Sequence, residues 1–473
     1  MKVLFVTSEA NPFAASGGLG DVMGALPVTL NENEGLEASV ILPLYDTVRK
    51  KYSHSLEKVC DISFKLSWRS TGASVYRIVH KNTTYFFVEN HYYFDRGALY
   101  GEWDDGERFA FFSMAVIEFM KQTGDIPDIL HANDWQSALT VIYLKTIYRT
   151  VSSLSSIRTL YTIHNIEYQG KFDKAILGDV FAIDSKYESY VTYDNCINLM
   201  KGAIVLTDRV STVSPNYANE LKFDYFAFGL SGIIEAASGK MSGIINGIDY
   251  SYFSPDKGGD IEFPYTKRNH VSGKRKNKLA LQKELGLEVN QEKPLVVMIT
   301  RLASQKGIDI VLCVLEEMLE LDLQLVILGT GEKEYETQLL DIEKRHKNFK
   351  ALIKFDRTLS KKMYASADIF LMPSKSEPCG LAQMIACSYG AVPLVRAVGG
   401  LYDSIIPYGQ ENSNGFNFSN YNAHELLFKL RDAISLYQNK KEWAALVKRA
   451  INSDFSWSKS AQEYISLYKK LLP

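Results

Sequence analysis

VLFVT at residues 3–7 and LVVMI at residues 295–299 are the two stretches that decide the fold of this chain. Both are short, uninterrupted apolar runs, which are typical of parallel β-strands buried on both faces. Each run leads into a glycine-containing loop and then a helical pattern. GGLG at residues 17–20 follows the first run, and RLASQKG at residues 301–307 follows the second. The chain therefore repeats one strand, loop and helix unit, which predicts two similar α/β domains.

Short β-branched runs alternate with helical patterns along the rest of the chain. In residues 308–321, for example, Ile308, Val311, Leu315 and Leu319 recur on one helix face. This alternation predicts an α/β fold of doubly wound sheets that are covered by helices. The other expected strands are residues 39–42, 84–88, 129–130, 159–163, 210–213, 243–245, 323–328, 351–354, 369–372 and 392–395.

The alternation is interrupted between residues 256 and 278. This stretch contains prolines, glycines and the basic cluster KRK at residues 274–276, which indicates a linker with a solvated basic loop. We therefore expect a first domain at 1–255 and a second at 256–455, with a final helix within 456–473 packing back onto the first domain. Two Rossmann-like domains facing each other would place the carboxyl ends of their strands across one deep cleft, where ligands of such sheets bind.

Composition and charge exclude several classes of function. The chain has 473 residues and a formal net charge of −2, which gives no long-range attraction to nucleic acid. Its 5 cysteines are scattered and form no Cys/His cluster, so neither a disulfide framework nor a structural zinc site is indicated. No run approaches the ~20 apolar residues of a membrane span, and the first apolar run is too short for a signal peptide. We expect a cytoplasmic protein without a membrane partner.

The loop after the first strand is a candidate anion site. Gly17 and Gly18 let backbone N–H groups approach an anion at the start of a helix near Asp21. The spacing is not G-x-G-x-x-G, which argues against a dinucleotide oxidoreductase. A plain tight turn is the alternative reading of these glycines.

Polar residues end two further strands of the first half. His131 and Asp134 follow one strand, and His164 follows the next. A single histidine at a strand end is more often structural than catalytic, but two neighbouring ones favour a catalytic role for at least one. The sequence has no nucleophile elbow, no H-E-x-x-H and no Walker A lysine, which excludes the corresponding hydrolases, zinc proteases and P-loop enzymes.

In the second half, Arg301 and Lys306 both follow the strand at residues 295–299 and suit a pyrophosphate, because arginine grips two oxygens and lysine supplies a point charge. A helix-entry loop with exposed cations is the alternative. Glu377 is expected to project from a later loop, beside the backbone N–H groups of Gly380 and Leu381. A carboxylate for sugar hydroxyls next to amides for phosphate fits a phosphate-activated sugar donor. Cys379, by contrast, carries no implied redox role.

Taken together, these motifs resemble those of the bacterial glycogen synthase and plant starch synthase family, retaining glucosyltransferases of the GT-B fold. The resemblance spans nearly the whole chain. It rests on residues 8–9 (SE), 17–19 (GGL), 21–22 (DV), 24–27 (GALP), 131–135 (HANDW), 164–165 (HN), 168–170 (YQG), 213–215 (VSP), 246–249 (NGID), 301 (R), 304–307 (SQKG), 373–374 (PS), 377–381 (EPCGL), 399–401 (GGL) and 455–457 (FSW).

The resemblance implies transfer of glucose from ADP-glucose or UDP-glucose, with ADP-glucose preferred, to an α-1,4-glucan such as glycogen, with retention and without an obligatory metal or other cofactor. In this reading Arg301 and Lys306 neutralise the diphosphate, and Glu377 and His164 hold the glucose. The implied catalytic residues are His164, Glu377, Asp134, Arg301 and Lys306. The implied donor-binding residues are Gly17, Gly18, Asp21, Asn246, Arg301, Lys306, Phe355, Cys379, Gly380 and Leu381, with Phe355 stacking on the nucleobase.

Two positions depart from patterns of related enzymes. Ile385 stands where other retaining transferases have a second glutamate, so attack on the same face as the departing phosphate is favoured over a two-carboxylate mechanism. Ala15 stands where the family commonly has a loop lysine, which bears on donor affinity and turnover. Two alternatives therefore stay open: a GT-B transferase with a small acceptor, and a glucan-binding relative with weakened catalysis.

Overall fold

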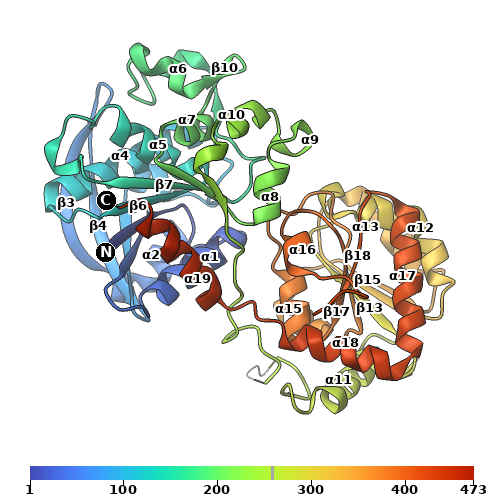
Figure 1. Cartoon of the computed structure of the whole chain (residues 1–473). Coiled ribbons are helices and arrows are strands. Elements are labelled where there is room, and N and C mark those ends of the chain that lie inside the picture. The colour runs from blue at the N-terminus through green and yellow to red at the C-terminus, as the bar shows by residue number, and fades with distance from the viewer. Residues whose placement is uncertain (257–259, 473) are drawn as a thin grey trace. The chain divides into compact units, whose positions relative to one another are not determined.

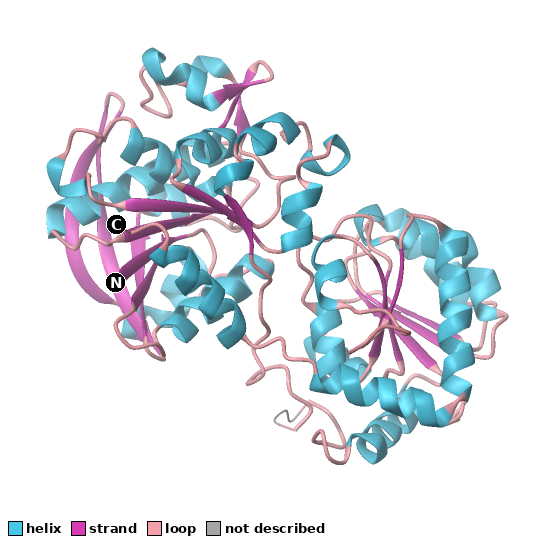
Figure 2. Ribbon diagram, viewed as in Figure 1, coloured by secondary structure: helices cyan, strands magenta, loops and turns pink. Residues whose placement is uncertain are grey.

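The computed structural model describes residues 1–256 and 260–472, and the chain folds into two compact units (Figure 1). The first domain comprises Met1–Ile244 and Trp457–Pro473, and the second comprises Ile245–Ser456. Each domain is built around a sheet with helices packed on it (Figure 2). The predicted α/β architecture with parallel sheets is confirmed.

The sheet of the first domain has the strand order β12-β11-β7-β6-β1-β2-β5-β4-β3. Neighbours from β12 to β5 are parallel, whereas β4 pairs antiparallel with both β5 and β3. A small antiparallel sheet, β8-β10-β9, is separate from it. The strands are β1 Lys2–Val6, β2 Glu37–Pro43, β3 Glu57–Leu66, β4 Arg69–His80, β5 Thr83–Glu89, β6 Ile129–Asn133, β7 Arg158–Ile163, β8 Lys171–Phe172, β9 Thr192–Tyr193, β10 Cys196–Asn198, β11 Arg209–Thr212 and β12 Met241–Gly243.

The hairpin β3–β4 is absent from the strands that the sequence predicts. In β3, buried Ile62, Phe64 and Leu66 alternate with solvent-facing residues, since one face of the strand packs on α4 (Asp105–Thr123) and the other faces solvent. Such alternation is typical of antiparallel strands, whereas continuous apolar runs mark parallel ones. Continuous runs therefore predict the parallel strands except the three-residue β18 (Phe416–Phe418), and they miss this hairpin.

The sheet of the second domain is parallel throughout, in the order β15-β14-β13-β16-β17-β18. Helices α12 (Ile308–Leu319), α13 (Lys333–Glu343) and α17 (Ala423–Gln438) pack together on one side of it, and α15 (Ala382–Ser388) and α16 (Gly399–Ser404) lie on the other (Figure 1). The strands are β13 Leu295–Ile299, β14 Gln324–Leu328, β15 Phe349–Leu352, β16 Ile369–Met372, β17 Val392–Arg396 and β18 Phe416–Phe418.

Helices complete both domains, and in α12 the predicted apolar face is buried. The helices of the first domain are α1 Gly18–Leu30, α2 Asp46–Tyr52, α3 His91–Phe94, α4 Asp105–Thr123, α5 Trp135–Lys145, α6 Glu188–Val191, α7 Leu199–Leu206, α8 Pro215–Glu220, α9 Asp224–Ala227, α10 Ser231–Ala236 and α19 Trp457–Lys469. Those of the second are α11 His270–Glu284, α12 Ile308–Leu319, α13 Lys333–Glu343, α14 Arg357–Ser366, α15 Ala382–Ser388, α16 Gly399–Ser404, α17 Ala423–Gln438 and α18 Lys440–Asn452.

The final helix α19 belongs to the first domain, where it packs along α1 (Figure 1). The chain enters the second domain at Ile245, ahead of the boundary expected at residue 255. Hydrogen bonds tie the intervening segment to that domain. The N–H of Ile248 donates to the carbonyl of Phe455 at 2.8 Å, and the hydroxyl of Tyr250 donates to the carbonyl of Ser453 at 3.3 Å.

The expectation of a solvated basic loop at residues 274–276 is wrong. These residues lie inside α11, and only Arg275 and Lys276 are exposed. Lys274 is buried, and its Nζ donates to the carbonyl of Ala365 at 3.3 Å. Burial lowers the pKa of Lys274 to about 7, partly opposed by the carboxylate of Asp368. The helical spacing places Lys274 on the face that packs on α14, which a composition-based reading does not detect.

Replacing Lys274 by methionine is expected to stabilise the protein at neutral pH. An unfolded lysine has a pKa of about 10.4, so between that value and the folded pKa of about 7 the unfolded chain binds more protons. Stability of the natural protein therefore rises with pH across this window, and methionine removes the penalty. Thermal unfolding at several pH values should show an advantage for Lys274→Met that shrinks as the pH rises. Lys276→Met, on the exposed side of α11, is the matched control, and equal behaviour of the two variants would refute the buried-charge account.

Candidate functional site

The glycine loop after β1 is held by the buried carboxylate of Glu9. That carboxylate accepts hydrogen bonds from the backbone N–H of Ser16 at 2.5 Å and of Gly17 at 3.2 Å, and from the Tyr100 hydroxyl at 2.6 Å. The amides of Ser16 and Gly17 are thus already used inside the domain. Gly18, the first residue of α1, is exposed, and open space surrounds the position that a Cβ would take.

The ends of β6 and β7 bring Asp134 and His164 into contact. Asp134 has a φ of 56°, a left-handed conformation that is uncommon for a residue with a Cβ. Its Oδ1 accepts the backbone N–H of His164 at 2.8 Å and that of Asn165 at 3.4 Å. The imidazole of His164 meets Asn133, with 2.9 Å between Nε2 and the amide Oδ1. Strand ends that are far apart in sequence therefore build one polar cluster.

Burial shifts the protonation of both groups. Burial raises the pKa of the Asp134 carboxyl to about 7, although the two backbone N–H groups that it accepts oppose this shift. Burial also lowers the pKa of His164 to about 3. The histidine is therefore a neutral imidazole at physiological pH, able to accept one hydrogen bond and donate another.

His131, the other strand-end histidine, has a structural role. It is fully buried, with Nδ1 2.8 Å from the Tyr468 hydroxyl of α19 and Nε2 2.5 Å from the hydroxyl of Thr162. Of the two histidines that the sequence left as alternatives, only His164 remains a candidate for catalysis.

In the second domain, Lys306 and Glu377 form an ion pair with 2.7 Å between Nζ and Oε2. The same carboxylate oxygen accepts a hydrogen bond from Ser374 at 3.1 Å. Glu377 is only 7% exposed, so the expectation that it projects from its loop is wrong. Its carboxylate is instead fixed by two partners, one of them the predicted phosphate-binding cation.

The loops that carry this pair are packed backbone to backbone. Gly307, with a φ of 78°, ends the loop of Lys306 and lies so close to Pro373 that a Cβ would come within 2.2 Å of its carbonyl oxygen. The backbone N–H of Gly400 donates to the carbonyls of Glu377 at 3.2 Å and Pro378 at 3.1 Å. Glycines thus set the spacing between the loops after β13, β16 and β17.

The remaining donor-binding candidates of this domain lie in different surroundings. Arg301 is exposed and donates to Gln305 Oε1 at 3.3 Å, and Phe355 is 79% exposed with the Arg357 guanidinium 5.8 Å from its ring. Asn246 is buried, and its Oδ1 has no hydrogen-bond partner in the part of the chain that the structure describes. An exposed aromatic ring, an exposed guanidinium and an unsatisfied buried carbonyl oxygen are all groups that a ligand can engage.

Three neighbours complete this end of the sheet. Burial raises the pKa of the Cys379 thiol to about 12, although a hydrogen bond from the Asn246 backbone opposes this shift. The thiol therefore stays neutral. Gly380 has a φ of 71° and precedes Leu381, which caps α15.

In the first domain, Asp21 accepts a hydrogen bond from the Asn11 side chain and is exposed.

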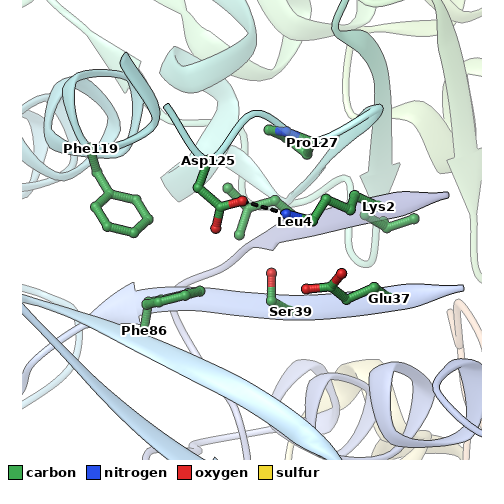
Figure 3. A pocket seen from close by; sticks show the side chains of 9 residues that line it. Lys2, Leu4, Glu37, Ser39, Phe86, Phe119, Asp125 and Pro127 are labelled. Carbon is green, nitrogen blue, oxygen red and sulfur yellow. Dashed lines mark hydrogen bonds and ion pairs between the residues drawn. The ribbon is translucent and has the colours of Figure 1, made fainter. Parts of the chain in front are cut away.

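A small pocket lies at the opposite, amino-terminal ends of β1 and β2 (Figure 3). It encloses about 20 Å³, room for about one water molecule. The ion pair between Lys2 and Asp125, 2.6 Å from Nζ to Oδ1, crosses it. Since ligands of parallel α/β sheets bind at the carboxyl ends of the strands, this pocket is not the candidate site.

Within residues 1–256 and 260–472, no group of three or more His, Cys, Asp or Glu side chains is arranged to hold a metal ion. No helix in those same segments is long and apolar enough to cross a membrane.

Comparison with known proteins decides the family. Residues 2–236 match the family described as "Starch synthase catalytic domain", and residues 283–451 match "Glycosyl transferases group 1". A glycogen synthase from Streptococcus agalactiae serotype III is 42% identical over 477 residues, covering 100% of both chains. One from Clostridium botulinum (strain Alaska E43 / Type E3) is 43% identical over 479 residues, covering 100% of this chain and 99% of that one. The chain belongs to the glycogen and starch synthase family.

Solved structures agree with this family membership. The catalytic domain of starch synthase IV from Arabidopsis thaliana, bound to ADP and acarbose, matches with a TM-score of 0.89 and 32% identity, covering 99% of both chains. A sucrose-phosphate synthase from Thermosynechococcus elongatus, 16% identical with a TM-score of 0.61, shares the fold. The resemblance to glycogen and starch synthases, the GT-B fold with two Rossmann-like domains and the glycosyltransferase activity are therefore confirmed.

Sequence patterns do not identify three residues that hold candidate residues of this site in place. Glu9, Asn133 and Ser374 all lie within motifs quoted above, but none was given a role. The available signal is position, because each ends a strand or lies within three residues after one whose carboxyl end carries a predicted site residue. Tyr100, by contrast, lies in a loop whose sequence gives no such signal.

Proposed function

We propose that this member of the family transfers glucose from ADP-glucose to the non-reducing end of an α-1,4-glucan, with retention of the anomeric configuration. The observation that carries the proposal is the ion pair between Lys306 and Glu377 at the carboxyl edge of the second sheet. It places a cation suited to a diphosphate beside a carboxylate suited to sugar hydroxyls. The ADP bound by the related starch synthase structure supports the choice of nucleotide.

In this mechanism Arg301 and Lys306 bind the diphosphate, and the backbone N–H groups of Gly18, Gly380 and Leu381 complete its binding. The leaving phosphate gains negative charge as the bond to glucose breaks, so fixed cations stabilise the transition state more than the ground state. The acceptor hydroxyl attacks on the same face, and a phosphate oxygen takes its proton.

The sugar and the base are assigned to the other candidates. Glu377 and neutral His164 hold the glucose hydroxyls, and Asp134 and Asn246 line the reacting region. The exposed ring of Phe355 stacks on the nucleobase.

Transfer of radiolabelled glucose into a glycogen primer tests this function. We expect incorporation with ADP-glucose to exceed that with UDP-glucose. Labelled product that forms only with a small sugar acceptor would favour another GT-B transferase. Glycogen binding without incorporation from either donor would favour a glucan-binding relative that has lost turnover.

Activity is expected to persist in excess EDTA. Two fixed cations, Arg301 and Lys306, take the place that a divalent metal has at the leaving phosphate of metal-dependent transferases. Initial rates with and without the chelator should agree. Loss of activity that magnesium or manganese restores would overturn the assigned role of the two side chains.

Ala15→Lys is expected to raise kcat/KM for the donor. A lysine Nζ roughly 4 Å from a phosphate gains ~1 kcal/mol in water and ~4 kcal/mol at an effective dielectric of 20, against up to ~2 kcal/mol of side-chain entropy. The net effect is a stabilisation of up to ~2 kcal/mol, which corresponds to an increase of about thirtyfold in kcat/KM. Steady-state kinetics decide the question, with Ala15→Met as the uncharged control of similar length.

The surroundings of Ala15 define the contrary outcome. A Cβ built on Gly20 would lie 2.4 Å from the Ala15 Cβ and 3.3 Å from Glu9 Oε2, so this carboxylate is a neighbour of the added lysine. If the lysine pairs with Glu9, it disturbs the loop instead of reaching the donor. An unchanged or lower kcat/KM for Ala15→Lys would therefore refute the simple account of a missing cation.

A further inference from the structure

The end of β6 holds His164 by its backbone and by its ring. Asp134 accepts the backbone N–H, and the amide Oδ1 of Asn133 lies 2.9 Å from Nε2 of the ring. Asn133 is fully buried, and its Nδ2 donates to the carbonyl oxygens of Val6 at 3.2 Å and His131 at 3.0 Å. Both N–H bonds of the amide are therefore used by groups that can only accept.

These contacts decide which way the amide points. Rotating the Asn133 amide by half a turn would place its oxygen against two carbonyl oxygens and lose both hydrogen bonds. Since Oδ1 must then face His164, and an amide oxygen only accepts, the ring nitrogen Nε2 must carry the proton. Nδ1 is left with its lone pair, and no described residue forms a hydrogen bond with it.

We propose that Asn133 is a positioning residue that fixes His164 as the Nε2–H tautomer, so that Nδ1 accepts a hydrogen bond from a hydroxyl of the transferred sugar. The identity of that hydroxyl rests on the proposed function, whereas the tautomer rests on the hydrogen bonds alone. A tautomer with the proton on Nδ1 would break the bond to Asn133 and offer the sugar a donor in place of an acceptor.

The charged and titratable groups around the ring leave it neutral. Asp134 faces the backbone of His164 from the loop after β6, and Glu9 acts on Asp134 from the loop after β1. His131 on β6 is itself neutral, because burial holds its pKa well below the usual value. Burial does the same for His164, so the lone pair on Nδ1 is present at physiological pH.

The tautomer can be read directly by NMR. In protein labelled with ¹⁵N-histidine, the ring signals of His164 are assigned by their loss in His164→Gln. We expect a protonated Nε2 and an unprotonated Nδ1 at neutral pH. A proton on Nδ1, in a neutral or a charged ring, would overturn the proposal, and this test does not depend on the enzyme's activity.

Asn133→Asp tests the role of the amide in catalysis. The carboxylate keeps an oxygen facing Nε2–H but stabilises the imidazolium, in which Nδ1 carries a proton and cannot accept. As the pH is lowered from about 8 to about 6, we expect kcat/KM for ADP-glucose to fall in this variant. The fall should be at least about fivefold larger than the fall in the natural enzyme over the same range. The natural enzyme gains no such acid limb from His164, since its pKa is lowered to about 3.

Asn31→Asp is the matched control in the same domain. Asn31 also donates from Nδ2 to two backbone carbonyls, of Ala38 at 2.9 Å and Asn82 at 3.0 Å, and accepts from the N–H of Ala38. It has no contact with His164. Parallel pH profiles for the two aspartate variants would overturn the proposal, and if Asn133→Asp does not fold, the NMR result decides. A natural enzyme that transfers no glucose would refute the proposed function while leaving the tautomer test intact.

Discussion

Lys306→Ala is expected to lower kcat/KM for the nucleotide-sugar at least about a hundredfold. A charge-assisted hydrogen bond contributes ~1.5–3 kcal/mol, and each ~1.4 kcal/mol is a factor of ten in rate. The loss should exceed the value of one such bond, because the leaving phosphate gains charge in the transition state. The variant also leaves the buried Glu377 carboxylate without its cation, 2.7 Å away in the natural protein.

Arg301→Ala separates these two contributions. Arg301 is exposed and its guanidinium donates to Gln305, so its removal leaves no buried charge unpaired. We expect a similar hundredfold or larger loss for this variant, with little change in Tm, if the diphosphate is what it binds. Lys344→Ala, which removes an exposed cation paired with Asp341, is the control for a general change in charge.

A double-mutant cycle with Glu377→Gln measures the coupling within the ion pair. If Lys306 acted only by holding Glu377, the double variant would be no worse than Glu377→Gln alone. A further loss in the double variant would assign Lys306 a direct contact with the donor. Near-natural turnover in folded Lys306→Ala or Arg301→Ala would refute the diphosphate assignment.

Most parallel strands of both domains could be predicted from the sequence, because burial on both faces requires continuous apolar runs. The exception is β18, which has only three residues and was not predicted. The runs at residues 295–299 and 369–372 coincide with β13 and β16. The hairpin β3–β4 was missed because its apolar residues alternate, and α11 was missed because its polar composition resembles a linker. Buried lysines are uncommon, so the sequence does not indicate that Lys274 is buried. Its burial follows from the packing of α11 on α14.

The sequence nominates candidate site residues, but it could not predict the contacts between them. Motif order placed Lys306 and Glu377 in the same kind of site, yet their direct ion pair depends on loops 71 residues apart in sequence. The clamp of Glu9 by Tyr100 joins loops 91 residues apart. Side-chain partners at such separations are set by how the strand ends align, which local patterns do not encode.

Gly400→Ala is expected to lower kcat/KM at least about a hundredfold, because displacing a catalytic group by about 1 Å has an effect of that size. A Cβ on Gly400 would lie 2.1 Å from the Cys379 carbonyl oxygen and 2.5 Å from its Cα. Both are backbone atoms, so the loop of residues 377–379 must move, and it carries Glu377 away from Lys306. The hydrogen bonds from the Gly400 N–H to the carbonyls of Glu377 and Pro378 are strained at the same time.

Steady-state kinetics and thermal unfolding together test this prediction. Overpacking by one methyl group destabilises a protein by ~1–3 kcal/mol, so a modest fall in Tm should accompany the loss of activity. Gly178→Ala is the matched control, since nothing lies within 4 Å of its Cβ position. A Gly400→Ala enzyme with natural kcat/KM would mean that the loop tolerates the displacement. The backbone contact between Gly400 and the loop would then not be what positions Glu377 for the sugar.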